Sequence, residues 1–447
     1  MRNIRVAVIG AGPAGIYASD ILCREHEGAT VDIFDRLPAP YGLVRYGVAP
    51  DHPRIKEIIK ALRRVLGNER IRFFGNVDFG KDLSVDDIHE FYDAVIYATG
   101  AIGDKELDIP GIDLPESYGA ADFVSWYAGH PDYPLEWPLE ATDVAVLGAG
   151  NVALDVARML AKTGEEQLVT EISDNIYQGL AKNPAKKIHV FARRGPAHIK
   201  FSPMELRELS HSPNVDVFVT EEGFQIDDAG QAEIGKHKAT KLVVDGLLKY
   251  LESEGTGAPH QIHIHMMQNP VEILGEDGHV VGIRTEVTEY NGDGSVRGTG
   301  EFIDTPVQAV YRAIGYRSDA LPGVPFDNRD AVIPNEGGRV LDEDGKHIAG
   351  TYATGWVKRG PVGLIGHTKS DATETIRNLM EDLDELPIPI HGSPDAVLEN
   401  LAAKGVEFTT SEGWDKLDAY EIALGEPQGR ERIKVQSRDE MMRVSRG

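Results

Sequence analysis

Two glycine-rich segments of the same kind occur in this 447-residue chain, and each has the same flanks. Residues 10–15 read GAGPAG and residues 148–153 read GAGNVA. A short apolar run precedes each segment, at residues 4–9 and 144–147, and an apolar helical pattern follows it. In that setting the glycines form a tight turn that admits a pyrophosphate group to the start of a helix. The sequence therefore predicts two dinucleotide-binding units in one chain.

Each segment supplies a set of predicted binding residues at the turn and the helix start. In the first segment these are Gly10, Gly12, Pro13, Ala14 and Gly15, and in the second they are Gly150, Asn151, Val152 and Ala153. One such motif alone is weakly specific, because glycine-rich turns occur in many proteins. Two motifs with complete flanks argue against a merely structural turn at both places.

The strand that follows each segment separates the two ligands. Residues 30–34 form an apolar run that ends at Asp35, where a carboxylate can accept hydrogen bonds from ribose hydroxyls and so favours FAD. Residues 187–192 lead instead to Arg193 and Arg194, and two guanidinium groups suit the 2′-phosphate of NADP. The alternative for the arginine pair is a solvated surface patch.

The order of these patterns predicts the domain organisation. An apolar strand at residues 94–97 runs into Ala-Thr-Gly, and the second glycine-rich unit follows, so it is interpreted as an insertion into the first. The expected fold is α/β, with two Rossmann-like domains of the glutathione reductase type. We expect the FAD-binding domain at residues 1–102 and 320–447 and the NADP-binding domain at residues 103–319.

Two further segments are assigned from local patterns. Turn signals such as residues 291–294 (NGDG) predict β-hairpins in the middle domain. Residues 391–447 are polar and carry no strong motif, so they are expected to form a peripheral extension.

Cysteine usage constrains where electrons can go. The single cysteine, Cys23, excludes an internal redox disulfide and a four-cysteine iron–sulfur cluster, and its helical setting favours a buried core residue. Electrons reaching a flavin would therefore leave to an acceptor outside the chain. No metal site is predicted.

Charge and hydropathy narrow the partners. The formal net charge of −26 argues against nucleic acid and anionic membranes. No apolar run approaches the length of a membrane span, and the first strand begins within a few residues of Met1, so a cytoplasmic protein is expected.

Two segments are basic against this acidic background. Residues 54–72 combine seven lysines and arginines with an amphipathic helical pattern, and residues 182–200 hold six with no acid. One interpretation is a solvated helix face together with the NADP phosphate site. The other is a docking face for a small acidic electron carrier. Its residues would be Arg54, Lys56, Lys60, Arg63 and Arg64.

Five motifs together resemble the adrenodoxin reductase family, which includes bacterial ferredoxin–NADP reductases. They lie, in the family's order, at residues 40–53, 150–155, 193–195, 205–208 and 355–363, and span most of residues 1–380. The resemblance implies a two-domain fold related to glutathione reductase, noncovalent FAD, and NADPH as hydride donor. It also implies a ferredoxin-like iron–sulfur protein as electron acceptor.

The same resemblance assigns individual residues. It places Ala14, Asp35, Leu43 and Val77 on FAD, with Trp356, Gly363, Leu364 and Ile365 against the flavin ring. It places Asn151, Val152, Arg193, Arg194 and Glu205 on NADP, with Gly363 near the nicotinamide. Asp35 departs from the glutamate usual in the family, which predicts a weaker ribose contact. Trp356 taken alone is also compatible with a core position.

His52 and Glu205 match the family's pair of residues near the reacting rings. Hydride transfer needs ring alignment more than a strong acid, so we expect this pair to position the rings and relay a proton. For His52 the alternative is a loop histidine with a structural hydrogen bond. For Glu205 it is a helix-capping carboxylate.

The expected reaction is a reversible electron transfer from NADPH through FAD to a one-electron iron–sulfur carrier. Two other functions use related cofactors. A flavin monooxygenase would bind FAD and NADPH but also hold dioxygen and an organic substrate. An NADPH-dehydrogenase subunit of a glutamate synthase-like complex is disfavoured by the absence of a cysteine cluster.

Overall fold

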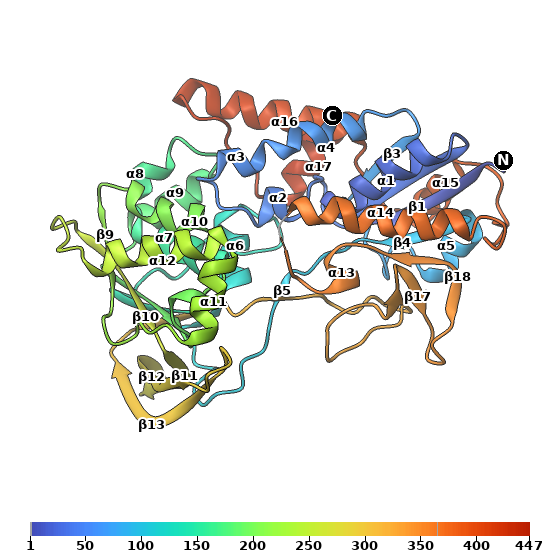
Figure 1. The fold of residues 1–447 in the computed structure, drawn as a ribbon. Helices are drawn as coiled ribbons and strands as arrows, with labels where there is room; N and C mark the ends of the chain where they lie inside the picture. Colours follow the sequence, from blue (N-terminus) through green and yellow to red (C-terminus); the bar gives the residue numbers. More distant parts are fainter. Residues whose placement is uncertain (1, 364) are drawn as a thin grey trace. The chain divides into compact units, whose positions relative to one another are not determined.

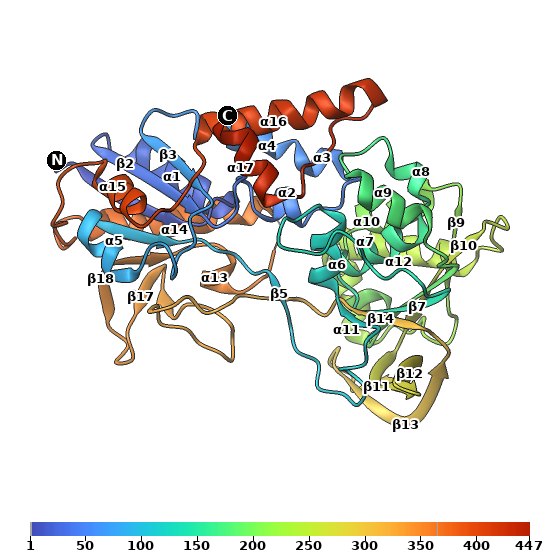
Figure 2. The ribbon, with the colours of Figure 1, turned by 180° about the vertical axis from the view of Figure 1, so that it is seen from behind.

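The computed structural model describes residues 2–363 and 365–447, and the chain forms two compact units (Figures 1 and 2). The first unit comprises Met1–Gly103, Ala128–Asp132 and Tyr316–Gly447. The second comprises Asp104–Tyr127 and Tyr133–Gly315. In sequence, the second unit thus lies between segments of the first and is itself interrupted by Ala128–Asp132.

A seven-stranded sheet forms the centre of the first unit, in the order β16-β17-β18-β4-β1-β2-β3. The five strands from β18 to β3 are parallel, and β17 and β16 extend the sheet in antiparallel fashion. The strands are β1 (Ile4–Ile9), β2 (Ala29–Asp35), β3 (Ile71–Gly75), β4 (Ala94–Tyr97), β16 (Asn335–Glu336), β17 (Arg339–Leu341) and β18 (His347–Ala353).

Helices α1 and α14 pack against each other in this unit (Figure 1). β1 carries apolar side chains to both faces, as expected of a central parallel strand, and Val6 and Val8 are fully buried. The helices are α1 (Pro13–Glu25), α2 (Leu43–Tyr46), α3 (Pro53–Lys56), α4 (Ile58–Leu66), α5 (Val85–Phe91), α13 (Trp356–Arg359), α14 (Ile365–Glu381), α15 (Ala396–Ala403), α16 (Ser411–Gly425) and α17 (Arg438–Arg446).

The second unit contains a six-stranded, wholly parallel sheet in the order β6-β14-β7-β8-β10-β9. Its strands are β6 (Ser117–Gly119), β7 (Asp143–Leu147), β8 (Lys187–Ala192), β9 (Val215–Val219), β10 (His260–Met266) and β14 (Ala309–Arg312). Its helices are α6 (Ala120–Tyr127), α7 (Asn151–Ala161), α8 (Gly164–Gln167), α9 (Asp174–Ala181), α10 (Pro203–Glu208), α11 (Asp228–Lys236) and α12 (Lys238–Leu251).

A three-stranded antiparallel sheet belongs to the same unit. Its strands are β11 (Gln268–Glu276), β12 (His279–Tyr290) and β13 (Val296–Thr305). The NGDG segment forms the turn between β12 and β13, with positive φ at Gly292 and Gly294, so the expected hairpin is confirmed. Short strands β5 (Gly103–Asp104) and β15 (Tyr316–Arg317) complete the set in the described residues.

The basic segment at residues 54–72 forms two helices rather than one. α3 and α4 are separated at Glu57, α4 ends at Leu66, and β3 starts at Ile71. Arg72 consequently lies in the sheet, where its guanidinium pairs with Asp32.

The expectation that residues 391–447 form a peripheral extension is wrong. Trp414 is 3% exposed, and Leu417 and Met441 are fully buried in the same core cluster as the apolar residues of β1 and β2. Helices α15, α16 and α17 each bury part of their surface, so scattered apolar residues in a polar sequence still join the core. In the part of the chain described here, none of the helices has both the length and the apolar character to cross a membrane.

Candidate dinucleotide-binding sites

The first glycine-rich turn connects β1 to α1 with two kinds of glycine. Gly10 has a φ of +114°, and a Cβ there would lie 2.4 Å from the carbonyl oxygen of Ala98. A Cβ at Gly15 would lie 2.1 Å from the carbonyl oxygen of Gly10. At Gly12, the residue just before α1, a Cβ would meet no atom within 4 Å. Gly10 and Gly15 therefore serve close backbone packing, whereas the space beside Gly12 fits the approach of a ligand's phosphates.

Asp35 stands at the carboxyl end of β2, as the sequence predicts. Its two carboxylate oxygens accept hydrogen bonds from the backbone N–H groups of Ala11, at 2.7 Å, and Leu37, at 2.8 Å. Burial raises the pKa of Asp35, and these two N–H groups oppose the rise. Each carboxylate oxygen keeps a second lone pair, so a ribose hydroxyl can still donate to it.

Two other predicted FAD residues lie near this strand end. The N–H of Val77 donates to the carbonyl of Asp35 at 2.9 Å, and Val77 is buried. Leu43 begins α2 after Gly42, and a Cβ at Gly42 would lie 3.1 Å from the Cα of Gly12. The loop before α2 therefore borders the first turn, and Val77, two residues after β3, contacts the end of β2.

A second loop approaches the same turn from the distal part of the chain. Gly355 has a φ of +74°, and a Cβ there would lie 2.6 Å from that of Ala14. The next residue, Trp356, is half-buried and stacks on Tyr316 with ring centroids 5.8 Å apart. Asp371 accepts a hydrogen bond from the N–H of Gly355 and so holds the loop. The structure brings Trp356 near the first turn without burying it in the core.

The structure also shows where the remaining predicted residues of the first unit lie. Gly363 is exposed, with a φ of +89°. Leu364 and the side chain of Ile365 lie outside the described residues, although α14 begins at Ile365. His52 is 3% exposed and occupies the position just before α3, with its N–H donating to the carbonyl of Ala49. The sole cysteine, Cys23, is buried in the core as predicted.

The second glycine-rich turn repeats this geometry between β7 and α7. A Cβ at Gly148, where φ is +141°, would lie 2.1 Å from the carbonyl oxygen of Ala313. At Gly150 a Cβ would again meet no atom within 4 Å. The open position precedes the helix start at Asn151, with Val152 and buried Ala153 following in the first turn of the helix. This site also fits the phosphates of a dinucleotide.

Glu205 is connected to this second turn through a short chain of contacts. The side-chain oxygen of Asn151 accepts a hydrogen bond from the N–H of Ser202 at 2.8 Å. Ser202 caps α10, its hydroxyl accepting from the N–H groups of Met204 and Glu205. Glu205 itself is 4% exposed. Ser202, not Glu205, is therefore the capping residue of α10. Because Ser202 also bonds Asn151, the start of α10 and Glu205 on it lie near the predicted NADP turn.

Arg193 and Arg194 follow β8 directly, as expected. Arg193 is exposed and Arg194 half-buried. Neither guanidinium forms a hydrogen bond or ion pair among the described residues, although Arg194 interacts electrostatically with Tyr290. Their backbone is held firmly, because the hydroxyl of Thr288 donates to the carbonyl of Arg193 and Gly195 N–H donates to the Tyr290 hydroxyl. Two free cations on a fixed backbone fit a 2′-phosphate.

Sequence reasoning missed the residues that hold these segments. Thr288 and Tyr290 come from β12, about a hundred residues beyond the arginine pair, and no local pattern marks them. Asp371 lies on α14 as one of three acids in that helix, and no local pattern distinguishes it from the other two. By contrast, the Ser-Pro pair before Glu205 is a readable helix-start signal.

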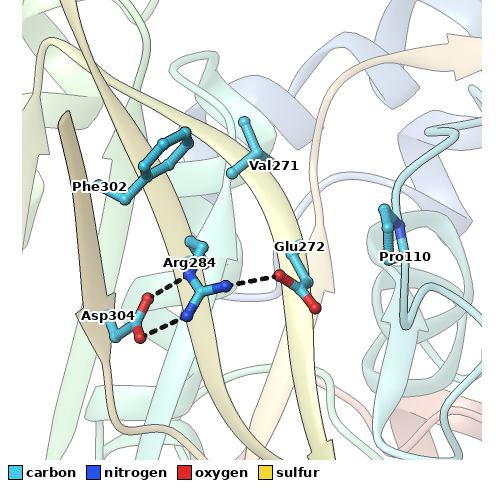
Figure 3. Close-up of a pocket in the computed structure, with 6 residues that line it drawn as sticks. All are labelled: Pro110, Val271, Glu272, Arg284, Phe302 and Asp304. Carbon is cyan, nitrogen blue, oxygen red and sulfur yellow. Dashed lines mark hydrogen bonds and ion pairs between the residues drawn. The ribbon is translucent and has the colours of Figure 1, made fainter. Parts of the chain in front are cut away.

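One surface hollow lies apart from both candidate sites. It measures about 570 Å³ and lies on the three-stranded sheet of the second unit (Figure 3). Arg284 at its centre is already paired with Glu272 and Asp304. No predicted site residue lines it, so it is separate from the dinucleotide turns.

Fold and candidate sites together define a class: a protein with two strand–glycine turn–helix units, in which the next strand ends at a carboxylate in one unit and leads to two arginines in the other. The family model described as pyridine nucleotide-disulphide oxidoreductase matches residues 4–201. The disulphide of that description cannot form within this chain, which has one cysteine.

Full-length relatives give a narrower assignment. The chain is 38% identical to NADPH:adrenodoxin oxidoreductase, mitochondrial, of Arabidopsis thaliana, covering 99% of this chain and 95% of that one. It is 37% identical to NADPH-ferredoxin reductase FprA of Mycobacterium tuberculosis, with both chains fully covered. A structure of the latter in complex with NADPH superposes with a TM-score of 0.90 at 36% identity, again over both full chains. The chain belongs to the adrenodoxin reductase-type family of ferredoxin–NADP reductases and is an oxidoreductase.

Proposed function

We propose that this chain carries electrons from NADPH to a ferredoxin-like iron–sulfur protein. FAD, when bound, accepts a hydride and releases its two electrons singly, which joins two-electron nicotinamide chemistry to a one-electron carrier. One observation carries the proposal. Two turns have the same geometry, but the strand after the first ends at the carboxylate of Asp35, and the strand after the second leads to the guanidinium groups of Arg193 and Arg194. The names of the full-length relatives support the same reaction.

The first unit is proposed as the FAD-binding domain. Its open helix start at Gly12 would receive the pyrophosphate, and Asp35 would accept a hydrogen bond from the adenosine ribose. The other residues in the proposed site are Gly10, Pro13, Ala14, Gly15, Leu43, Val77, Trp356, Gly363, Leu364 and Ile365. Gly355 supports this set, since its loop lies against Ala14.

The second unit is proposed as the NADP-binding domain. Gly150, Asn151, Val152 and Ala153 would bind the pyrophosphate at the start of α7. Arg193 and Arg194 would bind the 2′-phosphate with charge-assisted hydrogen bonds, which NADH cannot accept there.

His52 and Glu205 are proposed to align the reacting rings and to hold or relay a proton. Both side chains are nearly inaccessible to water, which limits their motion. We expect His52→Ala and Glu205→Ala each to slow flavin reduction by NADPH roughly 10-fold or more. Anaerobic stopped-flow absorbance measures this rate, and His89→Ala, on α5 of the first unit, is the matched histidine control. Wild-type rates in both variants would remove the assigned role.

The carrier is proposed to dock on the exposed basic side chains of α3 and α4. Their exposure and their existing ion pairs indicate which of them are available to a partner. Arg63 is already paired with Asp415 and Asp418, so its charge is largely compensated. Arg54 and Arg64 are exposed, and the ammonium of Lys60 lies 3.6 Å from the carboxylate of Glu57 in an exposed ion pair. Lys56 is half-buried. Arg54, Lys60 and Arg64 therefore supply most of the charge available to an acidic partner.

Charge reversal tests this docking face. Arg54→Glu combined with Arg64→Glu is expected to lower kcat/KM for ferredoxin about 10-fold at low salt and to flatten its salt dependence. Lys346→Glu, an exposed reversal in the turn between β17 and β18, is the control. An unchanged rate and salt slope in the double variant would place the docking face elsewhere.

The whole proposal is tested with the purified holoenzyme. The expected results are a flavin spectrum, bleaching by NADPH in preference to NADH, and reduction of an added ferredoxin. Protein without flavin, or equal bleaching by NADH, would contradict it. Hydrogen peroxide or hydroxylated product in excess of reduced ferredoxin would favour a monooxygenase instead. A cytoplasmic site of action is part of the proposal, and cell fractionation tests it.

A further inference from the structure

A buried ion pair connects α2 to the C-terminal helix α16. The guanidinium of Arg45, on α2, donates two hydrogen bonds to the carboxylate of Glu421, on α16, at 2.5 and 3.0 Å. The two side chains are only 3% and 0% exposed. The same carboxylate accepts from the N–H of Val435 at 2.9 Å, and Arg432 lies 3.5 Å away. Glu421 is thus the centre of a charged cluster formed by the C-terminal segment.

The C-terminal segment contacts this loop at two more points. The buried ammonium of Lys434 donates to the carbonyls of Arg45, at 2.6 Å, and Ala128, at 3.0 Å. The indole N–H of Trp414 donates to the hydroxyl of Tyr41 at 3.2 Å. Residues 41–46 are therefore held from one side by three side chains from residues 411–436.

The other side of the same loop borders the first glycine-rich turn. The N–H of Tyr41 donates to the carbonyl of Ala11 at 2.8 Å, and Gly42 lies against Gly12. Tyr41 adopts a φ of +86°, an uncommon conformation for a residue with a side chain, so contacts on both sides must maintain it. Movement of α2 would be transmitted to the place where the FAD site is proposed.

A buried ion pair contributes little net stability to a protein core. Two charges lose their hydration on burial, and apolar side chains of similar volume often stabilise a core as well or better. The ion pair instead provides a defined geometry, because two parallel hydrogen bonds fix the orientation of the guanidinium relative to the carboxylate. This physical difference separates a positioning role from a packing role.

We propose that Glu421 is a positioning residue for FAD binding, acting through Arg45 on residues 41–46. The inference rests on the proposed function of the first unit. Glu421 is not expected to touch the cofactor or any reacting atom. Its loss would let α2 and the preceding loop shift, which weakens FAD binding and changes the surroundings of the flavin.

The decisive variant replaces both charges with apolar groups, Arg45→Met with Glu421→Leu, and so leaves no unpaired charge in the core. If the variant folds, we expect FAD release at least 10-fold faster than from the wild-type holoenzyme, measured by the recovery of free-flavin fluorescence after dilution. We also expect an altered visible circular dichroism spectrum of bound FAD, which loss of stability alone would not change. Glu440→Gln, which breaks the exposed ion pair with Arg443 on α17, is the control with no change.

Each outcome decides the question. A folded double variant with wild-type FAD release and visible spectrum would overturn the inference and leave the pair as core packing. If the double variant does not fold, Lys434→Met takes its place, because it removes the donor to the Arg45 carbonyl but keeps most of the side chain. Several-fold faster FAD release in that variant supports the inference, and an unchanged rate overturns it. Wild-type protein that binds no FAD would refute the proposed function itself.

Discussion

The two glycine-rich turns of this chain have the same backbone geometry, but the strands that follow them lead to side chains of opposite charge. In both, the first glycine has a large positive φ and no room for a Cβ, and the third position of the motif faces open space. They differ at the end of the next strand. The carboxylate of Asp35 accepts hydrogen bonds from two backbone N–H groups, whereas the guanidinium groups of Arg193 and Arg194 form no hydrogen bond or ion pair among the described residues. In the proposed function, the turn accommodates a dinucleotide and the residues at the strand end select which one.

The largest expected effect tests the shared backbone. Gly10→Ala and Gly148→Ala each place a Cβ within 2.4 Å of a carbonyl oxygen at positive φ, so each should lose several kcal/mol of stability and accumulate poorly as folded protein. Gly150→Ala meets no atom and should fold with a normal Tm, while its KM for NADPH rises roughly 10-fold. Thermal unfolding and steady-state kinetics measure both. A stable, fully active Gly148→Ala protein would break the likeness of the two turns.

The next largest effect tests the charge difference. Arg193→Ala combined with Arg194→Ala should lower kcat/KM for NADPH about 100-fold, because two charge-assisted contacts with the 2′-phosphate are lost. The value for NADH should change little. Lys187→Ala, at the other end of β8, is the control from the same basic segment. An equal loss with both cofactors would mean that the arginines do not read the 2′-phosphate.

A smaller effect is expected at the corresponding position of the first unit. Asp35→Asn presents an amide N–H₂ toward a backbone N–H, so the turn loses an acceptor as well as the proposed ribose contact. FAD binding should weaken roughly 10-fold, as measured by fluorescence titration of the apoprotein. Asp35→Glu restores the residue usual in the family and should bind FAD at least as well as the wild type. Weaker binding by that variant would show that the shorter side chain suits this backbone.

The smallest effect contrasts the two units in their response to pH. In the second unit, burial raises the pKa of Asp104 to about 7 from 3.8, against the opposing N–H of Ala121. Between these values the folded chain holds a proton that the unfolded chain has lost, so stability falls as pH rises from about 4 to 7. Asp104→Asn keeps an acceptor for Ala121 and should raise Tm at pH 8 more than at pH 5.

Asp87 of the first unit provides the matched comparison. Despite the opposing effect of partial burial, hydrogen bonds from Ser84 and Lys404 lower the pKa of Asp87 to about 2. Its stabilising contribution is complete above pH 3.8 and is lost only as pH falls toward 2. Asp87→Asn should therefore lower Tm by the same amount at pH 5 and pH 8. A pH-independent Tm change in the Asp104 variant would remove the contrast.

Local sequence patterns predicted most of the elements that form the turns. β1, β4 and β8 are observed at the expected residues, because parallel strands buried on both faces appear as continuous apolar runs. The C-terminal region was misjudged for the opposite reason. Its helices carry one apolar stripe in a polar sequence, and the burial of Trp414 depends on a surface supplied by distant residues.

The sequence by itself determined that the chain has two strand–glycine turn–helix units, one followed by an acid and one by two arginines. Strand, glycine turn and helix are contiguous, so their chemistry can be read from neighbouring residues. Only the tertiary structure decided what holds those groups in place. Arg45 and Glu421 are 376 residues apart, and the arginine pair is held by Thr288 and Tyr290 from another sheet. Such contacts depend on how the chain returns on itself, which no local spacing records.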